Sequence, residues 1–312
     1  MKWSSPRLPL LCSFLTLLVV GASGFRICAY SMKDFNILKA KNFLLVHTLT
    51  RIVSRCDITL LQEVNDPDGS AIKILVSSLN RKVPRYENYT YRALTSVGLG
   101  NSPDNMQQYV FIYRTDTVNV TDQHQYRKAQ SFLREPFVVK FHSEKTEIKD
   151  FILVPLDSDH DRAVQEMDRL YDVFLEVTKK WNNTNVMFLG DFHASCGYMT
   201  RANKKNIRLF TNSKFTWLIG DRVDTTVTNQ ANCAYDRIVV HGRPLLEAIR
   251  PLSAKVFNFA KEFKLTKTRA LTLSDHLPVE VRLKSSALLL QAMPLLILLS
   301  MSAIVQSFLS AL

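Results

Sequence analysis

The chain has 312 residues, of which 46% are apolar. About 250 residues remain once the two ends are set aside, which suits one large domain with a buried core. The net charge is +12, and +10 remains outside residues 1–24, which carry Lys2 and Arg7 and no acid. This charge favours a polyanionic partner, nucleic acid or an anionic membrane surface, although scattered Lys and Arg serve solubility equally well. The sequence has no internal repeat, low-complexity linker, Gly-rich phosphate loop or CxxC pair, which excludes the common nucleotide and zinc motifs.

The first residues have the pattern of a signal peptide. Lys2 and Arg7 precede an apolar stretch over residues 8–20, and small residues at 22–24 form a cleavage site. We therefore expect residues 1–24 to be removed in the secretory pathway, leaving a single domain over residues 25–284 and a tail over residues 285–312.

The tail is hydrophobic, because no charged residue occurs from Ala287 to Leu312. A stretch of this length can span a bilayer, although Gln291, Pro294 and Gln306 weaken that interpretation. The alternative is a lipid-anchor signal with small acceptor residues at 285–287, but the polar spacer of that motif is missing. Both alternatives predict a membrane-attached protein of the endoplasmic reticulum lumen or the cell surface; without attachment the protein would be secreted.

Three Asn-X-Ser/Thr sequons agree with a lumenal or extracellular chain and predict glycosylation at Asn88, Asn119 and Asn182.

Four cysteines lie outside the signal peptide, at positions 28, 56, 196 and 233. An oxidising compartment permits disulfides, and four cysteines allow three pairings, among which the residues alone do not choose. Cys28 and Cys56 each sit at the edge of an apolar strand, and we expect both to be buried free thiols.

The predicted elements alternate between strands and helices. Phe25–Tyr30 reads as a strand, Phe43–Val53 as a helix and Ile58–Val64 as a strand, which is a β-α-β opening. A long amphipathic helix is predicted over Arg162–Trp181. Further strands are predicted at Tyr109–Tyr113, Phe137–Phe141, Phe151–Leu156, Val186–Leu189, Ile238–Val240 and Val279–Leu283. These proportions indicate an α/β fold.

A polar residue follows several of these apolar runs at the point where each one ends. In α/β proteins such strand ends face a common rim, where sites are assembled, although any one of these residues is also typical of a turn. The residues are Ser31, Glu63, Asp157, Asp191, His193, Asp236, Asp275 and His276.

Six segments of the chain resemble the signature segments of the deoxyribonuclease I family, in the same order. They are residues 60–64 (LLQEV), 133–141 (LREPFVVKF), 170–173 (LYDV), 190–192 (GDF), 232–240 (NCAYDRIVV) and 274–280 (SDHLPVE). The resemblance covers Phe25 to Leu283 and is greatest to the membrane-associated member of the family. It implies a four-layered α/β sandwich of two packed β-sheets flanked by helices. It also implies a disulfide between Cys196 and Cys233, whereas the family's second, short-range pair has no counterpart here.

The resemblance implies a catalytic site that is half retained. His276, Asp236 and Asp191 match one histidine and its carboxylates, while Glu63, Asp191 and Asp275 match the side of the site that holds Mg2+ or Mn2+. Four positions depart from the family: Asp157 and Gln107 replace a histidine and its glutamate partner, and His193 and Ser31 replace two asparagines that contact the phosphate or metal.

These departures predict weak or absent catalysis. Aspartate has a reference pKa of about 4, so we expect Asp157 to be an anion that repels phosphate and donates protons poorly. Losing one general acid or base commonly costs about 10²–10⁴ in rate. His160 or His193 is the alternative source of an imidazole.

Other family positions have also changed. Asn105 and Asn65 stand where the family has a tyrosine and an arginine that contact the DNA minor groove, whereas Arg134 keeps a phosphate-contacting position. Asp224, Thr226 and Thr228 resemble one structural Ca2+ site. We expect the second Ca2+ site to be lost, because Arg127 and Lys128 replace its acidic loop and only Glu135 remains.

Two functions follow. The first is a weak, metal-dependent endonuclease acting on double-stranded DNA. The second is a non-catalytic member that binds DNA, anionic lipid or a protein such as actin, which some relatives bind. In either case the expected state is a monomer.

Overall fold

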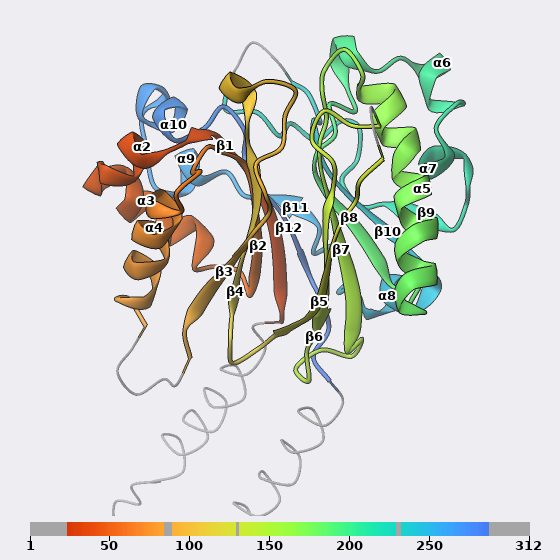
Figure 1. Ribbon diagram of the computed structural model, residues 1–312, viewed down its shortest axis with the longest axis horizontal. Helices are drawn as coiled ribbons and strands as arrows, with labels where there is room; N and C mark the ends of the chain where they lie inside the picture. Colours follow the sequence, from red (N-terminus) through yellow and green to blue (C-terminus); the bar gives the residue numbers. More distant parts are fainter. Residues whose placement is uncertain (1–23, 84–88, 129–130, 229–231, 287–312) are drawn as a thin grey trace, which may run out of the picture.

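The computed structural model of the chain describes residues 24–83, 89–128, 131–228 and 232–286 (Figure 1). Within these residues the strands form two six-stranded sheets that face one another. In spatial order the first sheet contains β11 (Lys255–Val256), β12 (Val279–Arg282), β1 (Arg26–Phe35), β2 (Ile58–Val64), β4 (Gln108–Arg114) and β3 (Tyr91–Thr95). The second contains β5 (Asn119–Gln125), β6 (Phe137–His142), β7 (Asp150–Asp157), β8 (Val186–Asp191), β10 (Asp236–His241) and β9 (Phe215–Trp217).

Helices cover the outer face of each sheet, so the four-layered α/β sandwich implied by the resemblance is confirmed (Figure 1). The helices beside the first sheet are α2 (Ile37–Lys41), α3 (Phe43–Val53), α4 (Ser70–Asn80), α9 (Phe259–Glu262) and α10 (Lys267–Leu273). Those on the side of the second sheet are α5 (Ala163–Trp181), α6 (Arg201–Lys204), α7 (Arg208–Thr211) and α8 (Arg243–Ala248).

Both sheets are mixed. β1 pairs with β2 in parallel through the crossover helix α3, and β7 pairs with β8 in parallel through α5. The other named strand pairs are antiparallel. As a result the carboxyl ends of β1, β2, β7 and β8 meet at one end of the sandwich. The described chain ends leave from the opposite end (Figure 1).

Three apolar layers hold the sandwich together. Ile27 and Phe111 from the first sheet meet Phe141 and Met187 from the second in a fully buried layer between the sheets. A second layer lies between the first sheet and its helices, and a third lies between the second sheet and α5. On α5 the buried positions follow helical spacing, as predicted: Met167, Leu170, Phe174 and Val177. Burying these side chains removes a large apolar area from water, which is the main favourable term in folding.

The predicted helices and central strands are present, whereas several edge strands were not predicted. β5 has mostly exposed polar residues, so it lacks an apolar run or alternation, and β3 is similarly exposed at an edge of the first sheet. β1 extends beyond the predicted segment to Phe35 through an irregular pairing, in which Lys33 and Asp34 adopt left-handed φ values of 49° and 55°. The helix α4 was also not predicted, and no side chain caps its first turn.

Two disulfides are present. The implied bond between Cys196 and Cys233 is confirmed, with a sequence separation of 37. The expectation that Cys28 and Cys56 are free thiols is wrong, because they form a second bond with a separation of 28 and Cα atoms 6.2 Å apart. Cys28 lies on β1 and Cys56 precedes β2, so the parallel pairing of the two strands brings the thiols together.

Some predictions concern the ends and the surface. Asn119 and Asn182 are exposed, whereas Asn88, the signal peptide up to residue 23 and the tail from residue 287 lie outside the described residues. Among the residues that the structure describes, no helix has the length and apolar character needed to cross a membrane.

Removing either disulfide is expected to lower the free energy of unfolding by about 3–4 kcal/mol, because each bond limits the entropy of the unfolded chain. The variants are Cys28→Ser/Cys56→Ser and Cys196→Ser/Cys233→Ser, compared with the wild type by urea unfolding. Alkylation of the unreduced, unfolded protein should find all four of these cysteines blocked. A reactive thiol at position 28 or 56 would show that the second bond does not form.

Candidate functional site

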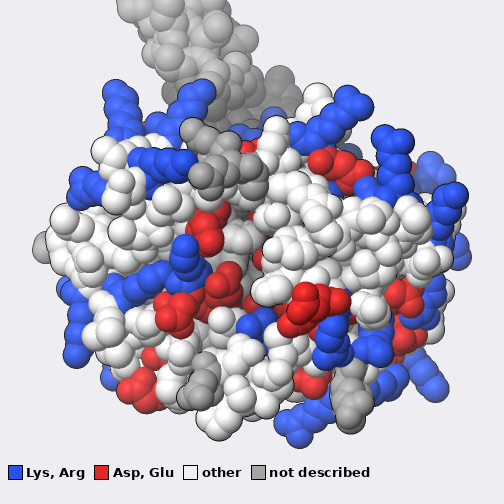
Figure 2. All heavy atoms as spheres, turned by 90° about the horizontal axis from the view of Figure 1, so that it is seen from above, with Lys and Arg blue, Asp and Glu red and all other residues white. Residues whose placement is uncertain are grey.

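The polar residues at the strand ends converge on a cavity of about 460 Å3 at one end of the sandwich. Figure 2 looks onto this end and shows acidic side chains gathered in a central hollow, with Lys and Arg toward the edges. The predicted site residues that line the cavity are Glu63, Asn105, Gln107, Arg134, Asp157, His160, Asp191, His193, Asp275 and His276. Ser31 and Asp236 are buried and hydrogen-bonded to two of them.

His276 is held between two carboxylates. Its Nδ1 lies 2.8 Å from Oδ2 of the fully buried Asp236, and its Nε2 lies 3.7 Å from Oδ2 of Asp191. Asp236 and Asp191 are register partners on β10 and β8, so the sheet itself sets this arrangement. Burial opposes a charge on His276, but the carboxylates of Asp236 and Asp191 outweigh it and raise the pKa of the imidazole well above its usual value. The two carboxylates therefore favour the imidazolium form of His276.

Glu63, the last residue but one of β2, has a left-handed φ of 54°, and its side chain lines the cavity. Ser31 Oγ donates a hydrogen bond to Glu63 Oε1. Burial raises the pKa of Glu63, while the Ser31 bond and the nearby His276 act in the opposite direction. The shorter Ser31, standing where the family has asparagine, thus still donates to this carboxylate.

Asp157 occupies the other flank of the cavity and is 4% exposed. Its backbone N–H donates to Tyr109 Oη at 2.9 Å, and Tyr109 Oη donates to the Arg134 carbonyl at 3.2 Å. Arg134 Nη1 lies 3.5 Å from Asp157 Oδ2, and Arg134 Nη2 donates to Asn105 Oδ1 at 3.1 Å. The Arg134 guanidinium thus contacts both Asp157 and Asn105, and it also lines the cavity.

The structure argues against the expectation that Asp157 is an anion at neutral pH. Loss of water around the buried carboxyl raises its pKa to about 8, although Arg134 acts in the opposite direction. The usual value of about 4 applies to an exposed carboxyl. Burial therefore favours the protonated form of Asp157.

His193 follows β8 in a left-handed conformation with φ 47°. Its backbone N–H donates to Asp191 Oδ1 at 3.0 Å, and its Nδ1 lies 3.2 Å from Ser158 Oγ. The ring packs against Tyr198 and Tyr235, with centroids 5.0 and 5.4 Å apart. His160 is exposed, and its ring lies 5.5 Å from that of His193. Both histidines therefore line the same cavity as Asp157, and the alternative that one of them supplies an imidazole stays a prediction.

Several residues that position the site were not predicted. Gln62 is buried and bridges the sheets: its Nε2 donates to the Leu156 carbonyl at 2.6 Å, and its Oε1 accepts from Asp191 N at 3.1 Å. Gly190 makes this possible, because a Cβ there would lie 2.3 Å from the Leu156 carbonyl and 2.6 Å from Gln62 Oε1. The apolar run ending in Gln62-Glu63 was visible in the sequence, but its bridging role was not.

Two more buried charges hold the loops around the cavity. The Arg237 guanidinium donates to the carbonyls of Ala194 and Ile219 and to Asp221. Glu166 accepts from the backbone N–H groups of Leu133 and Asp159 at 2.7 and 3.2 Å, and burial raises its pKa to about 7. Arg237 lies in the signature segment 232–240, but the sequence did not predict that it or Glu166 would hold a loop.

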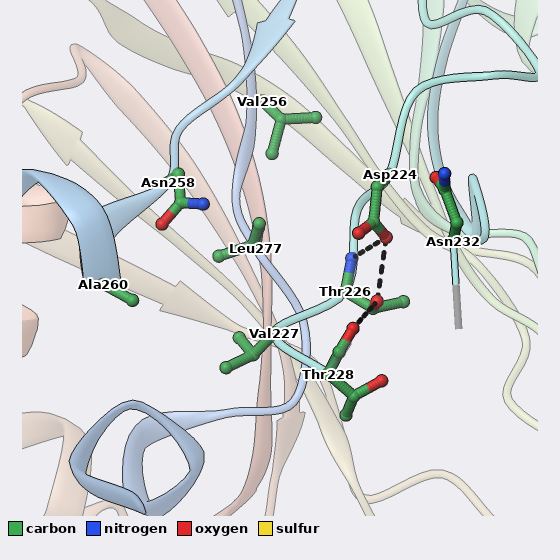
Figure 3. Close-up of a pocket in the computed structure, with 9 residues that line it drawn as sticks. All are labelled: Asp224, Thr226, Val227, Thr228, Asn232, Val256, Asn258, Ala260 and Leu277. Atoms are coloured by element: carbon green, nitrogen blue, oxygen red, sulfur yellow. Dashed lines mark hydrogen bonds between the residues drawn. The ribbon is translucent and has the colours of Figure 1, made fainter. Parts of the chain in front are cut away.

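The predicted Ca2+ residues lie in a separate cavity of about 470 Å3 (Figure 3). Asp224 Oδ1 accepts hydrogen bonds from the backbone N–H and the hydroxyl of Thr226, and the Thr226 hydroxyl also contacts the Thr228 carbonyl at 3.3 Å. The described residues thus bring Asp224, Thr226 and Thr228 together, as the resemblance implied. At the expected lost site, Lys128 pairs with Glu176 instead, with Nζ 3.7 Å from Oε2.

Comparison with known proteins decides the family. Residues 35–276 match the Endonuclease/Exonuclease/phosphatase family. Deoxyribonuclease gamma of Mus musculus is 38% identical over 288 residues, covering 91% of this chain and 92% of the mouse protein. Deoxyribonuclease-1 of Rattus norvegicus is 42% identical over 283 residues, covering 89% of this chain and 97% of the rat protein. The chain belongs to the deoxyribonuclease I family. Its assignment to the membrane-associated member stays a prediction.

Solved structures agree on the fold of this family. The human Nocturnin catalytic domain with bound sulfate has a TM-score of 0.57 at 14% identity, covering 84% of this chain and 95% of that domain. The complex of D. rerio TDP2 with a single-strand DNA product has a TM-score of 0.54 at 12% identity, covering 84% of this chain and all of that one. At these identities the likeness concerns the fold alone.

The buried Asp157 predicts a specific pH dependence of stability. Its pKa is about 4 in the unfolded chain and rises to about 8 in the folded chain. Its stabilising contribution is therefore complete below about pH 4 and is lost as the pH rises through about 8. In EDTA, we expect the free energy of unfolding to fall by more than about 1 kcal/mol between mildly acidic and mildly alkaline pH, and to fall less in Asp157→Asn.

Urea unfolding at a series of pH values measures both slopes. Asp161→Asn, which removes an exposed carboxylate from the same loop, is the matched control and should keep the wild-type slope. Identical slopes in the wild type and Asp157→Asn would contradict the raised pKa.

Proposed function

We propose that the chain is a divalent-metal-dependent endonuclease that hydrolyses phosphodiester bonds of double-stranded DNA at a low rate. The observation that carries this proposal is the hydrogen-bonded Asp236–His276 pair, which opens into the same cavity as Glu63 and Asp191. Because the chain belongs to the deoxyribonuclease I family, nuclease chemistry is the expected activity of such a site.

The chain's own residues supply proton donors on both flanks of the cavity. Asp236 accepts from His276 Nδ1 and orients the ring, so Nε2 of the imidazolium faces the cavity and can protonate a leaving oxygen or stabilise phosphate charge. Asp157 is the second proton carrier. Hydrolysis also needs a base to take a proton from water. The replacement of a histidine and its glutamate partner by Asp157 and Gln107 is the reason that we propose for a low rate.

The carboxylates of Glu63 and Asp191 fit a magnesium or manganese ion. Mg2+ is commonly held by one or two carboxylates with waters and substrate phosphate, rather than by a complete protein cage. Within the described parts of the chain, no cluster of three or more His, Cys, Asp or Glu is arranged to hold a metal by itself. The burial that raises the pKa of Glu63 makes a cation at this place favourable. When bound, such an ion supplies charge to stabilise the phosphate and to activate water.

Asp275 contributes less to such a site than predicted. Its Oδ2 pairs with Lys33 Nζ at 3.3 Å, and its side chain is 40% exposed. We assign it to the rim, where the Lys33–Asp275 pair faces the cavity.

Contacts to DNA are weakened in a similar way. Asn105 and Asn65 lack the ring and the guanidinium of the family positions, and each such loss is worth about 1–3 kcal/mol of binding. Arg134 lines the cavity and can contact phosphate, but Asp157 and Asn105 compete for its guanidinium. This competition favours the second candidate, a non-catalytic member that binds DNA, anionic lipid or a protein such as actin.

The proposal includes the cellular compartment in which the protein acts. The two disulfides suit an oxidising compartment, and family membership suits an exported protein. Entry through residues 1–24, attachment through residues 285–312 and a monomeric state remain part of the proposal.

The nuclease proposal is tested by incubating the purified Phe25–Ser286 segment with supercoiled plasmid and Mg2+ plus Ca2+, and separately with Mn2+. We expect slow nicking that His276→Ala removes. Nicking equal to that of His276→Ala, with DNA still bound, would favour the non-catalytic function.

Restoring the family residues tests why the rate is low. The variant carrying Ser31→Asn, Gln107→Glu, Asp157→His and His193→Asn should nick at least about 100-fold faster than the wild type, since single acid or base groups contribute about 10²–10⁴. No gain would locate the deficit in the DNA-binding surface, which filter binding at several salt concentrations measures.

We further propose that Asp224, Thr226 and Thr228 hold one structural Ca2+. Hard Ca2+ requires several oxygen ligands, and this cavity offers a carboxylate, a hydroxyl and a backbone carbonyl (Figure 3). Millimolar Ca2+ should raise the melting temperature of the wild type but not of Asp224→Ala, by a few degrees according to binding linkage. An equal rise in both proteins would place the Ca2+ elsewhere.

A further inference from the structure

Three large apolar side chains are exposed on the helical layer beside the first sheet. Leu38, on α2, is 75% exposed, and Phe43 and Leu44, in the first turn of α3, are 73% and 61% exposed. The Asn42 side chain accepts a hydrogen bond from Leu45 N and so caps the start of α3, which holds the backbone that carries Phe43 and Leu44 in place. We call residues 38–44 with their exposed side chains the α2–α3 face. Adjacent exposed apolar groups of this size usually mark a binding surface.

A groove continues this face toward α10. It is a cavity of about 250 Å3 between α3 and the segment that contains α10. Leu44, Leu45, Leu265 and Leu273 supply its apolar lining, and Arg269 stands among them. The apolar area therefore extends beyond the three exposed side chains and is bordered by a cation.

The charge of this layer is strongly one-sided. The helices α2, α3, α4, α9 and α10 together carry seven Lys or Arg and a single acid, Glu262. On the opposite side of the molecule, α5, α6, α7 and α8 together carry seven Lys or Arg and five acids. The two layers thus hold equal numbers of basic residues, but those beside the first sheet are almost without acids, so the excess positive charge is larger on this face.

Several of these cations are available to a partner. Lys41, Lys261, Lys267 and Arg269 are exposed, and within the described part of the chain none of them makes an ion pair. Figure 1 shows α2, α3, α9 and α10 grouped on one side of the molecule, and Leu44 and Arg269 line the same groove there. Figure 2 shows Lys and Arg along both sides of the molecule. Apolar tips and unpaired cations thus share one surface.

We propose that the α2–α3 face docks onto the surface of an anionic phospholipid membrane. Leu38, Phe43 and Leu44 would enter the boundary between headgroups and acyl chains, and the cations around them would contact lipid phosphates and carboxylates. Nucleic acid is the less suitable occupant, because aliphatic tips gain little from phosphate or base edges. This surface is separate from the cavity of the proposed nuclease, so the inference does not depend on that activity.

The test is co-sedimentation of the protein with phosphatidylcholine vesicles that contain or lack phosphatidylserine. The full chain and the Phe25–Ser286 segment, which contains both described sheets, are compared, so that the effect of residues 287–312 is separated. In both proteins we expect added binding to the phosphatidylserine vesicles. Leu38→Ser/Phe43→Ser/Leu44→Ser should reduce that added binding by about tenfold or more, since each lost apolar contact is worth a severalfold change.

Charge variants complete the design. Lys41→Glu/Lys267→Glu/Arg269→Glu should also lose the added binding, whereas Lys179→Glu/Lys180→Glu on α5 is the matched control and should keep it. All substituted side chains are at the surface, and thermal unfolding checks that each variant is folded. Equal binding by the triple serine variant and the wild type would overturn the proposal. Loss of duplex DNA binding in the charge variant, with vesicle binding unchanged, would reassign the face to nucleic acid and also overturn it.

Discussion

The site depends on one buried hydrogen-bonded bridge between the two sheets. The Gln62 amide, on β2, donates to the Leu156 carbonyl on β7 and accepts from Asp191 N on β8. An amide buried without partners would be costly, so both bonds must form together, and they fix the spacing of the strands at the end where the polar side chains of the cavity emerge. Gly190 is part of this constraint, because any side chain there would collide with the bridge. Glu63 and Asp191 flank the cavity as a direct consequence.

Burial of charge gives the cavity its chemical character. Four carboxyl groups, Glu63, Asp157, Asp191 and Asp236, lie inside the sandwich with His276 and Arg134 as the nearby cations. Under these conditions a carboxyl either pairs with a cation or keeps its proton. Asp236 pairs with His276, whereas burial raises the pKa of Asp157 to about 8 despite Arg134. In the proposed nuclease, Asp157 would therefore be a proton donor at the position where the family has a histidine.

The two outer layers of the sandwich serve different purposes. On one side, α5 packs against its sheet and balances its own charges. On the other side, short helices leave apolar tips and unpaired cations exposed. The cavity and the α2–α3 face lie on different parts of the molecule and share no lining residue, so the two proposed functions can be tested separately.

The sequence by itself determined the architecture and most of the site. Its apolar runs located the central strands, α3 and α5, and the polar residues at the ends of those runs meet as predicted, because strand and helix periods are local properties. Only the tertiary structure decided the Cys28–Cys56 bond, the Gln62 bridge and the protonation of Asp157. The physical reason is the same in each case. Pairing and pKa depend on which distant groups replace water around a side chain, and that is decided when the sheets close on one another.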